Sequence, residues 1–334
     1  MLLLCNYYIT YRCNAYCNFC HFGDHSKFKN TPFADLDIFK KNVSELSQIG
    51  VKFIDLTGGE PLLHKDVDKM ALFAKSLKMQ TSITTNCLLY PKYAERLAGN
   101  VNLLHFSLDS PVEDEHNAIR NIACYKKVFE SIEIAKSLNE YPDILFTVTN
   151  ETYKKLPEMH DIAIKQDLVL LVNPVFSYFN NPGLNDEALD YIEEYCEGKP
   201  NIYLNKAFIR IRKNGGNNTE KPSCKAVSRV IVISPNNEIV LPCYHLGNKL
   251  LPIDKPIKEL REEETINYYR QNEGKFDFCS GCTINCYFEP SFAFPLNYLS
   301  VLSMSSKFRY GYHKLIKQNI KKILFRKTIN HNEV

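Results

Sequence analysis

The chain has 334 residues, of which 45% are apolar and 24% charged, and its net charge is +3. A chain of this length buries a hydrophobic core without help from a metal, and its composition excludes a disordered, collagenous or coiled-coil protein. It has no run near the ~20 apolar residues of a membrane span, and its first residues lack the features of a signal peptide, so we expect a cytoplasmic protein.

Residues 1–200 alternate short apolar segments with helical patterns. The segments expected to form strands are 3–9, 52–57, 79–84, 101–108, 144–149 and 168–175. The helical patterns lie at 36–49, 67–77, 92–98, 125–138 and 154–165. Strands that alternate with helices predict an α/β fold with a parallel sheet covered by helices. This periodicity fits an open barrel and a doubly wound sheet equally well.

A second region follows a loop-forming stretch at 213–218, which is rich in Gly and Asn. Residues 227–234 and 238–241 are expected to pair as a β-hairpin, because Pro235-Asn236-Asn237 between them is typical of a turn. A charged helix is expected near residues 258–270.

The last part of the chain is first apolar and then basic. Residues 305–334 carry eight basic and one acidic side chain, +7, so the rest of the chain sums to −4. One face of an expected helix collects the apolar side chains Phe308, Tyr312, Leu315, Ile316, Ile320, Ile323 and Leu324. Such a helix is typical of contact with an anionic membrane surface and equally of packing on the body of the protein. The acidic body and the lack of a recognisable module make nucleic acid an unlikely partner.

Twelve cysteines are unevenly placed along the chain. Three lie within eight residues, at Cys13, Cys17 and Cys20, and five more lie between Cys224 and Cys286. In a reducing compartment, clustered thiols indicate a metal or cluster site, whereas scattered ones indicate small buried hydrophobes. The scattered ones are Cys5, Cys87, Cys124 and Cys196.

The first three cysteines follow directly after the first expected strand. Three thiolates on one loop can bind three irons of a [4Fe–4S] cluster and leave the fourth iron open to a reactant. Zinc is the alternative, and it would need a fourth ligand, for which His21 and His25 are available.

The motif Cys-x3-Cys-x-Phe-Cys after a first strand resembles that of the radical S-adenosylmethionine (radical SAM) superfamily. Further motifs match in the order and at the strand ends that this family uses: Gly58-Gly59-Glu60-Pro61, Ile83-Thr84-Thr85-Asn86, Phe106-Ser107-Leu108-Asp109-Ser110 and His116-Asn117-Ala118-Ile119-Arg120. The resemblance covers about residues 1–200. It implies a partial (β/α)6 barrel of the TIM type.

The resemblance also implies the chemistry and the site. A [4Fe–4S] cluster on Cys13, Cys17 and Cys20 would bind S-adenosylmethionine (SAM), and a low-potential donor of flavodoxin or ferredoxin type would reduce it. Cleavage of SAM would give a 5′-deoxyadenosyl radical that abstracts hydrogen from a substrate. In the family, the carboxylate of Glu60 would meet the methionine amine and Arg120 the methionine carboxylate. The expected cofactor contacts are Phe19, Gly58, Gly59, Glu60, Thr85, Asn86, Ser107, Asp109 and Arg120, with Phe19 near the adenine and Ser107 and Asp109 near the ribose.

The second cysteine set resembles that of the twitch domain, a shortened relative of the SPASM domain. Cys224 and Cys243 flank the expected hairpin, and Cys279 and Cys282 follow downstream. The resemblance implies an auxiliary [4Fe–4S] cluster on Cys224, Cys243, Cys279 and Cys282, with Cys286 as an alternative ligand. A structural zinc site, in which His245 could take part, is the other interpretation.

We therefore expect three parts: a radical SAM core barrel at 1–205, a twitch/SPASM-like domain at 206–289, and an apolar and then basic tail at 290–334. The expected substrate is a small molecule or a lipid, and the tail would allow a peripheral position at the inner membrane surface. A maturase that modifies a ribosomal peptide is the second hypothesis, and a zinc-stabilised binding protein is the third. No catalytic side chain is singled out.

Overall fold

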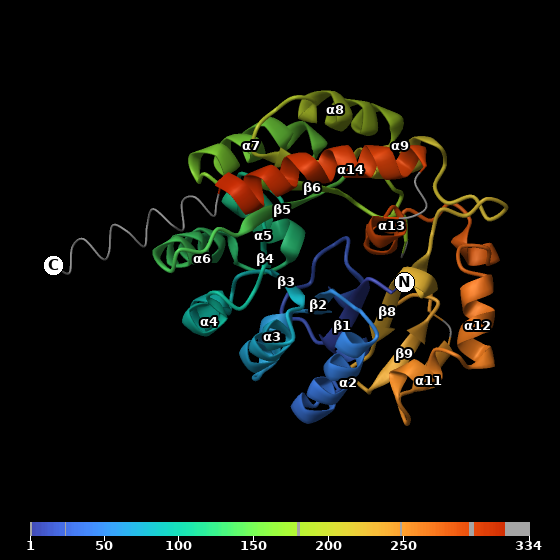
Figure 1. The fold of residues 1–334 in the computed structure, drawn as a ribbon. Helices are drawn as coiled ribbons and strands as arrows, with labels where there is room; N and C mark the ends of the chain where they lie inside the picture. Colours follow the sequence, from blue (N-terminus) through green and yellow to red (C-terminus); the bar gives the residue numbers. More distant parts are fainter. Residues whose placement is uncertain (1, 24, 179–180, 248, 294–296, 318–334) are drawn as a thin grey trace.

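The computed structural model describes residues 2–317, apart from 24, 179–180, 248 and 294–296. One ten-stranded sheet runs through it in the order β10-β9-β8-β1-β2-β3-β4-β5-β6-β7 (Figure 1). The strands β1 to β7 are all parallel, and they are Leu4–Thr10, Phe53–Gly58, Gln80–Thr85, Leu103–Ser107, Asp143–Val148, Leu170–Pro174 and Ile202–Tyr203. The six expected strands are thus confirmed.

The order of the strands decides between the two architectures that periodicity allowed. In a doubly wound sheet the chain turns back and adds later strands beside the first. Here β1 to β7 follow one another in chain order, so the sheet curves in one direction as a barrel does, and its two edge strands, β7 and β10, do not pair. The fold is a partial, open α/β barrel.

Helices follow the strands and cover the outer face of the barrel. The five expected helices are confirmed as α2 Leu36–Gln48, α3 Val67–Ser76, α4 Tyr90–Leu97, α6 Tyr125–Ser137 and α7 Leu156–Lys165. The other helices of this part are α1 His25–Phe28, α5 Glu113–Arg120, α8 Asp186–Cys196 and α9 Lys206–Lys213, with single turns at η1 His21–Gly23, η2 Pro61–Leu63 and η3 Tyr153–Lys155.

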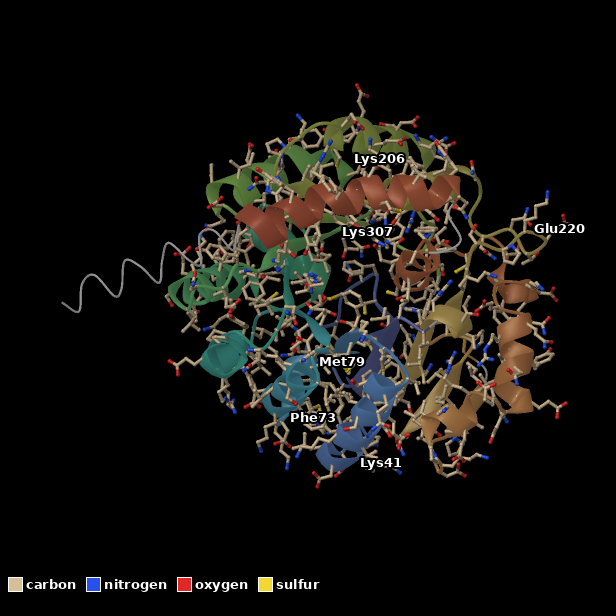
Figure 2. The ribbon with its side chains drawn as sticks, in the orientation of Figure 1. Lys41, Phe73, Met79, Lys206, Glu220 and Lys307 are labelled. Atoms are coloured by element: carbon tan, nitrogen blue, oxygen red, sulfur yellow. The ribbon has the colours of Figure 1, made fainter. Side chains whose placement is uncertain are left out.

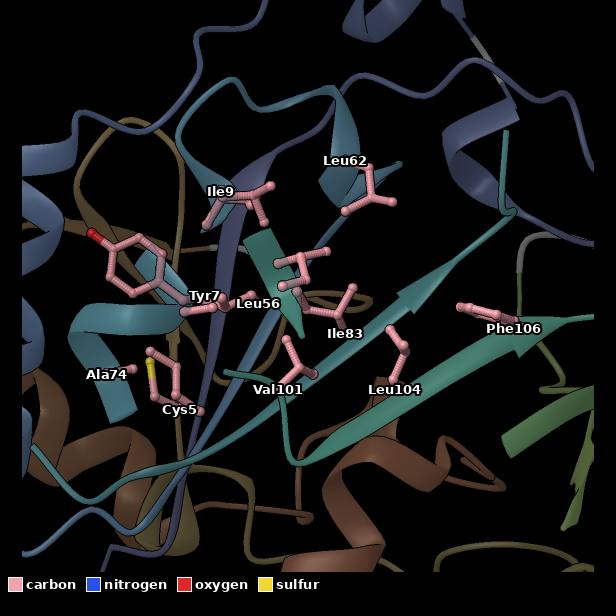
Figure 3. Close-up of a cluster of buried hydrophobic side chains, with 14 of the residues drawn as sticks. Cys5, Tyr7, Ile9, Leu56, Leu62, Ala74, Ile83, Val101, Leu104 and Phe106 are labelled. Atoms are coloured by element: carbon pink, nitrogen blue, oxygen red, sulfur yellow. The ribbon is translucent and has the colours of Figure 1, made fainter. Parts of the chain in front are cut away.

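The alternation of side chains along the strands separates an apolar layer from a polar lumen. Figure 3 shows the apolar layer, where Cys5, Tyr7, Ile9, Leu56, Ile83, Leu104 and Phe106 gather against the helices. Successive side chains of a strand point to opposite faces. The intervening residues, among them Asn6, Asp55, Ser82, Thr84 and His105, therefore face the lumen. All four scattered cysteines are buried, as expected.

The expected hairpin extends the same sheet. It consists of β8 Val230–Ile233 and β9 Glu238–Leu241, with β10 Lys249–Pro252 beside β9, whereas residues 226–229 form the short helix α10 Ala226–Arg229 instead of strand. Strand β8 pairs in parallel with β1, from Leu4 opposite Val230 to Tyr7 opposite Ile233. The hairpin therefore continues the barrel beyond its first strand.

The expected helix at 258–270 is wrong as a continuous element. The structure has α11 Ile257–Leu260 and α12 Glu264–Gln271, and the chain breaks between them. The guanidinium of Arg270 donates to the carbonyl of Arg261 at 2.6 Å, which takes up a group that a continuous helix would use for its own hydrogen bond.

The C-terminal helices pack against the barrel. They are α13 Asn285–Ser291, α14 Tyr298–Gly311 and the π-helical η5 Tyr312–Lys317, and α14 lies along α9 and β7 (Figure 1). The η5 segment is anchored by the buried carboxylate of Asp143, which accepts hydrogen bonds from Tyr310 at 2.6 Å and from Lys314 at 2.8 Å. No helix in the described ranges has both the length and the apolar character of a membrane span.

The face of α14 that packs on the protein carries buried serines beside Leu299 and Leu302, and its outer face is apolar. Ser300 and Ser303 are fully buried, and Ser303 accepts a hydrogen bond from Asn205 at 3.0 Å. The outer stripe consists of Tyr298, Val301, Met304, Phe308 and Tyr312, each of which is more than half exposed. The side chains of Leu315 and Ile316, and residues 318–334 with Ile320, Ile323 and Leu324, lie outside the described part.

Candidate active site and cluster cavity

The loop that carries the first three cysteines is tied to the barrel by backbone and amide hydrogen bonds. The backbone amides of Tyr16 and Asn18 donate to the carbonyls of Arg120 and Ile119, at 3.0 and 3.1 Å. The side-chain amide of Asn86 donates to Asn14 at 2.7 Å. The loop after β1 is therefore held by the ends of β3 and α5. This contact explains why the motifs at 83–86 and 116–120 occur together with the cysteine motif.

Gly58 and Gly59 allow the end of β2 to approach this loop. A Cβ atom on Gly58 would lie 1.9 Å from the carbonyl oxygen of Thr10, and one on Gly59 would lie 2.3 Å from that of Arg12. The amides of Gly59 and Glu60 donate to these same carbonyls at 3.1 and 2.9 Å. In this structure the two glycines are thus required by contact with the cysteine loop.

Glu60 is buried and its carboxylate is held in place by three donors. One oxygen accepts from the Thr85 hydroxyl at 2.8 Å and from the amide of Leu62 at 3.0 Å, and the other accepts from the amide of Asn86 at 2.9 Å. Burial raises the pKa of Glu60, and these hydrogen bonds oppose the rise. A fixed, buried carboxylate at this position is suited to bind an ammonium group.

Arg120 and Asp109 form a buried ion pair beside the cysteine loop. Two nitrogens of Arg120 donate to one oxygen of Asp109 at 2.7 Å, and the amide of Thr147 donates to the other at 3.0 Å. Burial raises the pKa of Cys17, and the positive charge of Arg120 opposes this. Asp109 therefore orients Arg120 beside Cys17, while its ribose contact and that of the buried Ser107 stay predictions.

Phe19 lines an open cavity next to the three cysteines. The cavity is bounded by this loop, by the ends of β5 and β6 and by residues 181–183, and Asn181 donates to the carbonyl of Phe19 at 2.9 Å. Its rim carries Glu115, Glu151 and Lys155. The position of Phe19 is compatible with its expected place near the adenine.

The four cysteines of the second set surround one cavity. Cys224, Cys243, Cys279 and Cys282 line it together with mainly apolar residues from α10, from the loop after β9 and from α13. Burial raises the pKa of Cys243 to about 12 and that of Cys279 to about 11. The thiols are thus grouped in an apolar enclosure, where a metal centre would take them as thiolates.

Cys286 and the histidines lie apart from this cavity. Neither Cys286 nor His245 is among the residues that line it. His245 packs instead against the rings of Tyr178 and Tyr244, with centroids 4.8 and 5.4 Å away. In the first set, His21 packs on Phe28, and the side chain of His25 lies outside the described part.

Arg212 is a buried cation next to the four-cysteine cavity, and sequence analysis missed it. Its guanidinium donates to the carbonyls of Pro174 and Thr283, at 3.0 and 3.1 Å, and to Asn285 at 3.0 Å. Within the described ranges it forms no ion pair, and burial lowers its pKa. A buried guanidinium without a carboxylate is costly, so a negatively charged group in the adjacent cavity would compensate it.

Which metal centre each of the two cysteine sets binds stays a prediction. No three His, Cys, Asp or Glu side chains in the described ranges are close enough to hold one metal ion. Thiolates on a four-iron cluster bind different irons and lie farther apart than the ligands of one ion. Arg212 beside the second set fits the negative charge of thiolates bound to a cluster or to zinc, whereas Arg120 is already paired with Asp109.

Comparison with known proteins now identifies one domain of the chain. Residues 7–163 match the Radical SAM superfamily. The chain carries a radical SAM domain. A probable GTP 3′,8-cyclase of Methanococcus vannielii is 28% identical over 278 residues, covering 78% of this chain and 90% of that protein. A GTP 3′,8-cyclase of Desulforamulus reducens is 34% identical over 142 residues, 40% of this chain and 42% of that protein.

Solved structures agree with the fold of the radical SAM domain and extend the likeness beyond it. The structure of native anSMEcpe with bound AdoMet superposes with a TM-score of 0.63 at 17% identity, over 96% of this chain and 99% of that one. Streptococcus suis SuiB bound to its precursor peptide SuiA superposes with a TM-score of 0.62 at 18% identity, over 85% of this chain and 70% of that one. At these identities the likeness concerns the fold alone.

The protein is thus a SAM-dependent iron–sulfur enzyme whose cofactors are a [4Fe–4S] cluster and SAM. The family match does not decide which residues bind these groups. The structure shows where the expected residues lie. It brings Glu60, Thr85, Asn86, Arg120 and the three-cysteine loop into one connected network.

Proposed function

We propose that this protein is a radical SAM enzyme with an auxiliary [4Fe–4S] cluster, which abstracts hydrogen from a small-molecule or lipid-type substrate in the barrel lumen. The observation that carries the proposal is the presence of two separate cysteine sets. Three thiols lie on the loop after β1, and four surround one apolar cavity behind α13. The division of the chain into a core at 1–205, an auxiliary part at 206–289 and a tail at 290–334 belongs to the same proposal.

The residues around the first set would hold the cofactor in a fixed orientation. When bound, the cluster and SAM supply a 5′-deoxyadenosyl radical by one-electron cleavage of a carbon–sulfur bond. The carboxylate of Glu60 would accept the methionine ammonium, because Thr85 and Asn86 already fix its position. Arg120, oriented by Asp109, would bind the methionine carboxylate. The donor that reduces the cluster is proposed to be a flavodoxin or ferredoxin.

The lumen argues against a polyphosphate substrate such as the GTP in the relatives' names. The lumen-facing positions of the described strands β1 to β6 carry neither Lys nor Arg, and of their two acids, Asp55 and Asp143, the second is paired with Lys314 at 2.8 Å. A triphosphate needs several cationic or amide donors. A neutral or cationic substrate fits these walls better.

The peptide-modifying maturase is the second candidate. SuiB, whose fold is similar, has been solved with its precursor peptide, so this fold can bind a peptide. Incubation with deuterium-labelled small molecules, lipids and peptides separates the two candidates, since only a substrate transfers deuterium into 5′-deoxyadenosine. Transfer from a peptide alone would reject the small-molecule proposal.

We expect the anaerobically reconstituted protein to contain about eight irons, as two four-iron clusters require. Changing Cys224 and Cys282 to Ala is expected to halve the iron and to leave 5′-deoxyadenosine formation from SAM and dithionite detectable. Changing Cys13, Cys17 and Cys20 to Ala is expected to abolish that formation. Cys286→Ser is the matched control and should keep all the iron. Four irons in the unmodified protein, or zinc in place of the second cluster, would refute the auxiliary cluster.

We further propose that the outer face of α14 rests on an anionic membrane surface, which would place the enzyme at the periphery of the inner membrane. The stripe from Tyr298 to Tyr312 is apolar and exposed, with Phe308 83% exposed. The chain beyond it is strongly basic, and Lys321, Lys322, Arg326 and Lys327 follow the described part. Apolar insertion combined with basic residues is the usual requirement for peripheral binding. Lys307, labelled in Figure 2, pairs with Glu289 at 2.8 Å, so its charge contributes less to membrane binding.

Flotation with phosphatidylglycerol vesicles tests this surface. The double change Val301→Ser and Phe308→Ser is expected to lower the bound fraction at least about tenfold. The reason is that two apolar side chains can no longer transfer from water into the membrane. Leu72→Ser, which removes a similarly exposed apolar side chain from α3, is the matched control. Equal binding of both variants, or equal binding to neutral phosphatidylcholine vesicles, would contradict the proposal. Truncation near residue 304 is unsuitable, because it would leave the buried Asp143 without Tyr310 and Lys314.

A further inference from the structure

A cavity of about 750 Å³ lies at the end of the barrel opposite the three-cysteine loop. Its walls come from α2, α10, α11 and α12, and α2 contacts α11 while α10 contacts α12. Leu2, which precedes β1, and Ser228, which precedes β8, line it. The cavity is thus at the amino ends of two parallel strands, whereas the cofactor site of such a barrel is at the carboxyl ends. Its volume is that of a site for a small ligand.

Two arginines from the break between α11 and α12 line this cavity. One terminal nitrogen of Arg270 donates to the carbonyl of Arg261 at 2.6 Å, and the other donates to Asn267 at 2.7 Å. The Nε atom of Arg270 is buried and has no hydrogen-bond partner among the described residues. The two terminal nitrogens of Arg261 reach only the carbonyl of Val227, at 3.5 Å, which is the limit for a hydrogen bond.

The acceptors of both guanidinium groups are neutral. In the part of the chain that is described, neither Arg261 nor Arg270 forms an ion pair, although both side chains are only partly exposed. Burial and the charge of Arg270 lower the pKa of Arg261 to about 10, and the charge of Glu262 opposes this fall only in part. Two guanidinium groups at one cavity repel each other and lose hydration, and an anion between them would compensate both costs.

Carboxylates also line the cavity, those of Glu45, Glu259 and Glu262. Glu45 accepts a hydrogen bond from the amide of Ile257 at 2.7 Å and is held at the start of α11. Glu259 and Glu262 are exposed, so water and salt screen their charges. Among the described residues, none of the three lies within ion-pairing distance of the arginines. The partly buried charge of the cavity is therefore positive, and its exposed charge is mixed.

We propose that Arg261 and Arg270 form a binding site for an oxyanion, the phosphate or carboxylate group of a small organic compound. Guanidinium groups match the geometry of such oxyanions and bind them with paired hydrogen bonds. Apolar contacts for the rest of the ligand come from Leu2, Ile49 and Pro256. The site shares no lining residue with the four-cysteine cavity or with the cavity at Phe19, so it goes beyond the proposed function and does not depend on it.

Protection of the two arginines from chemical modification tests the site in the unmodified protein. Phenylglyoxal, which reacts with guanidinium groups, is added to the full chain in a buffer free of phosphate, and modification of each arginine is followed by peptide mass spectrometry. We expect excess inorganic phosphate to slow modification of Arg261 and Arg270 at least about fivefold, as a largely occupied site does. Arg96, which is 47% exposed and lies 3.3 Å from Asp68, is the internal control and should keep its rate.

Three variants make the protection specific. Arg270→Gln is expected to abolish the protection of Arg261, and Arg261→Gln that of Arg270, because one guanidinium group alone holds the anion weakly. Arg96→Gln removes a partly exposed guanidinium group from α4 and should leave the protection unchanged. The unmodified protein decides the matter even if one variant fails to fold. There, a lack of protection by phosphate would overturn the proposal, and so would equal protection by chloride at the same ionic strength or two unreactive arginines.

The same measurement distinguishes the two sources of the oxyanion. Acetate and phosphate are compared at equal ionic strength. Protection by phosphate alone assigns the site to a phosphate group, whereas equal or stronger protection by acetate assigns it to a carboxylate. Iron content and 5′-deoxyadenosine formation are not part of this readout, so failure of the anion site and failure of the proposed function are observed separately.

Discussion

Gly59→Ala is expected to remove the cluster of the radical SAM domain and to leave the chain folded. The new Cβ atom would lie 2.3 Å from the carbonyl oxygen of Arg12 and 2.9 Å from the Cβ of Cys13, and both belong to the cysteine loop. The loop must then move by about an ångström to restore van der Waals distances. We expect the iron content to fall by about half and 5′-deoxyadenosine formation to fall about a hundredfold or more, as ångström misplacements of catalytic groups do.

A second glycine supplies the control for this experiment. A Cβ atom on Gly311, in α14, would meet no atom within 4 Å, so Gly311→Ala is expected to keep both iron and activity. Iron analysis and electron paramagnetic resonance of the reduced protein measure the effect on the clusters. Full iron occupancy in Gly59→Ala would show that the contact between β2 and the loop does not hold the cysteines.

Arg120→Met is expected to destabilise the fold by about 3–5 kcal/mol, the range found when one partner of a buried ion pair is removed. Asp109 is fully buried and would keep only the hydrogen bond from the Thr147 amide. The substitution leaves the backbone of Arg120 in place, so the contact with Tyr16 can persist while the charge beside Cys17 is lost. Urea unfolding of the unmodified and variant proteins measures the change in free energy.

An exposed ion pair is the control for the buried one. Lys126 and Glu113 lie 3.3 Å apart, with the lysine 83% exposed, so Lys126→Met is expected to change the free energy of unfolding by less than about 1 kcal/mol. Adding Asp109→Leu to Arg120→Met is expected to recover much of the loss, because it removes the unpaired charge. A single Arg120→Met variant as stable as Lys126→Met would contradict the buried-pair argument.

The parts of the fold that were predictable from sequence are those encoded by short-range patterns. Strand and helix periodicities locate β1 to β6 and the helices between them, because each pattern is complete within a few residues. The cysteine spacing likewise locates both cysteine sets, and the metal that each would bind stays a prediction. The role of Gly58 and Gly59 was only partly predictable, since the two glycines imply a close approach but the partner, the carbonyls of Thr10 and Arg12, is visible only in the structure.

What the sequence leaves undecided depends on contacts between distant residues. The second set has five thiols, and only the tertiary structure separates Cys286 from the four that line the cavity. The helical pattern of the tail locates an apolar face but not the side that packs, and in α14 the buried side is the one with Ser300 and Ser303. The break at Arg261 depends on Arg270, whose side chain reaches back over nine residues.

The pairing of β8 with β1 has a consequence for how this enzyme matures in the cell. Strand β1 is synthesised first, but β8, the second strand that pairs with it, is complete only when residues 230–233 have left the ribosome. Until then one edge of the strand that precedes the cysteine loop lacks its partner, and an unpaired edge invites association with other chains. Insertion of iron and sulfide is therefore expected to follow the synthesis of residues 230–233.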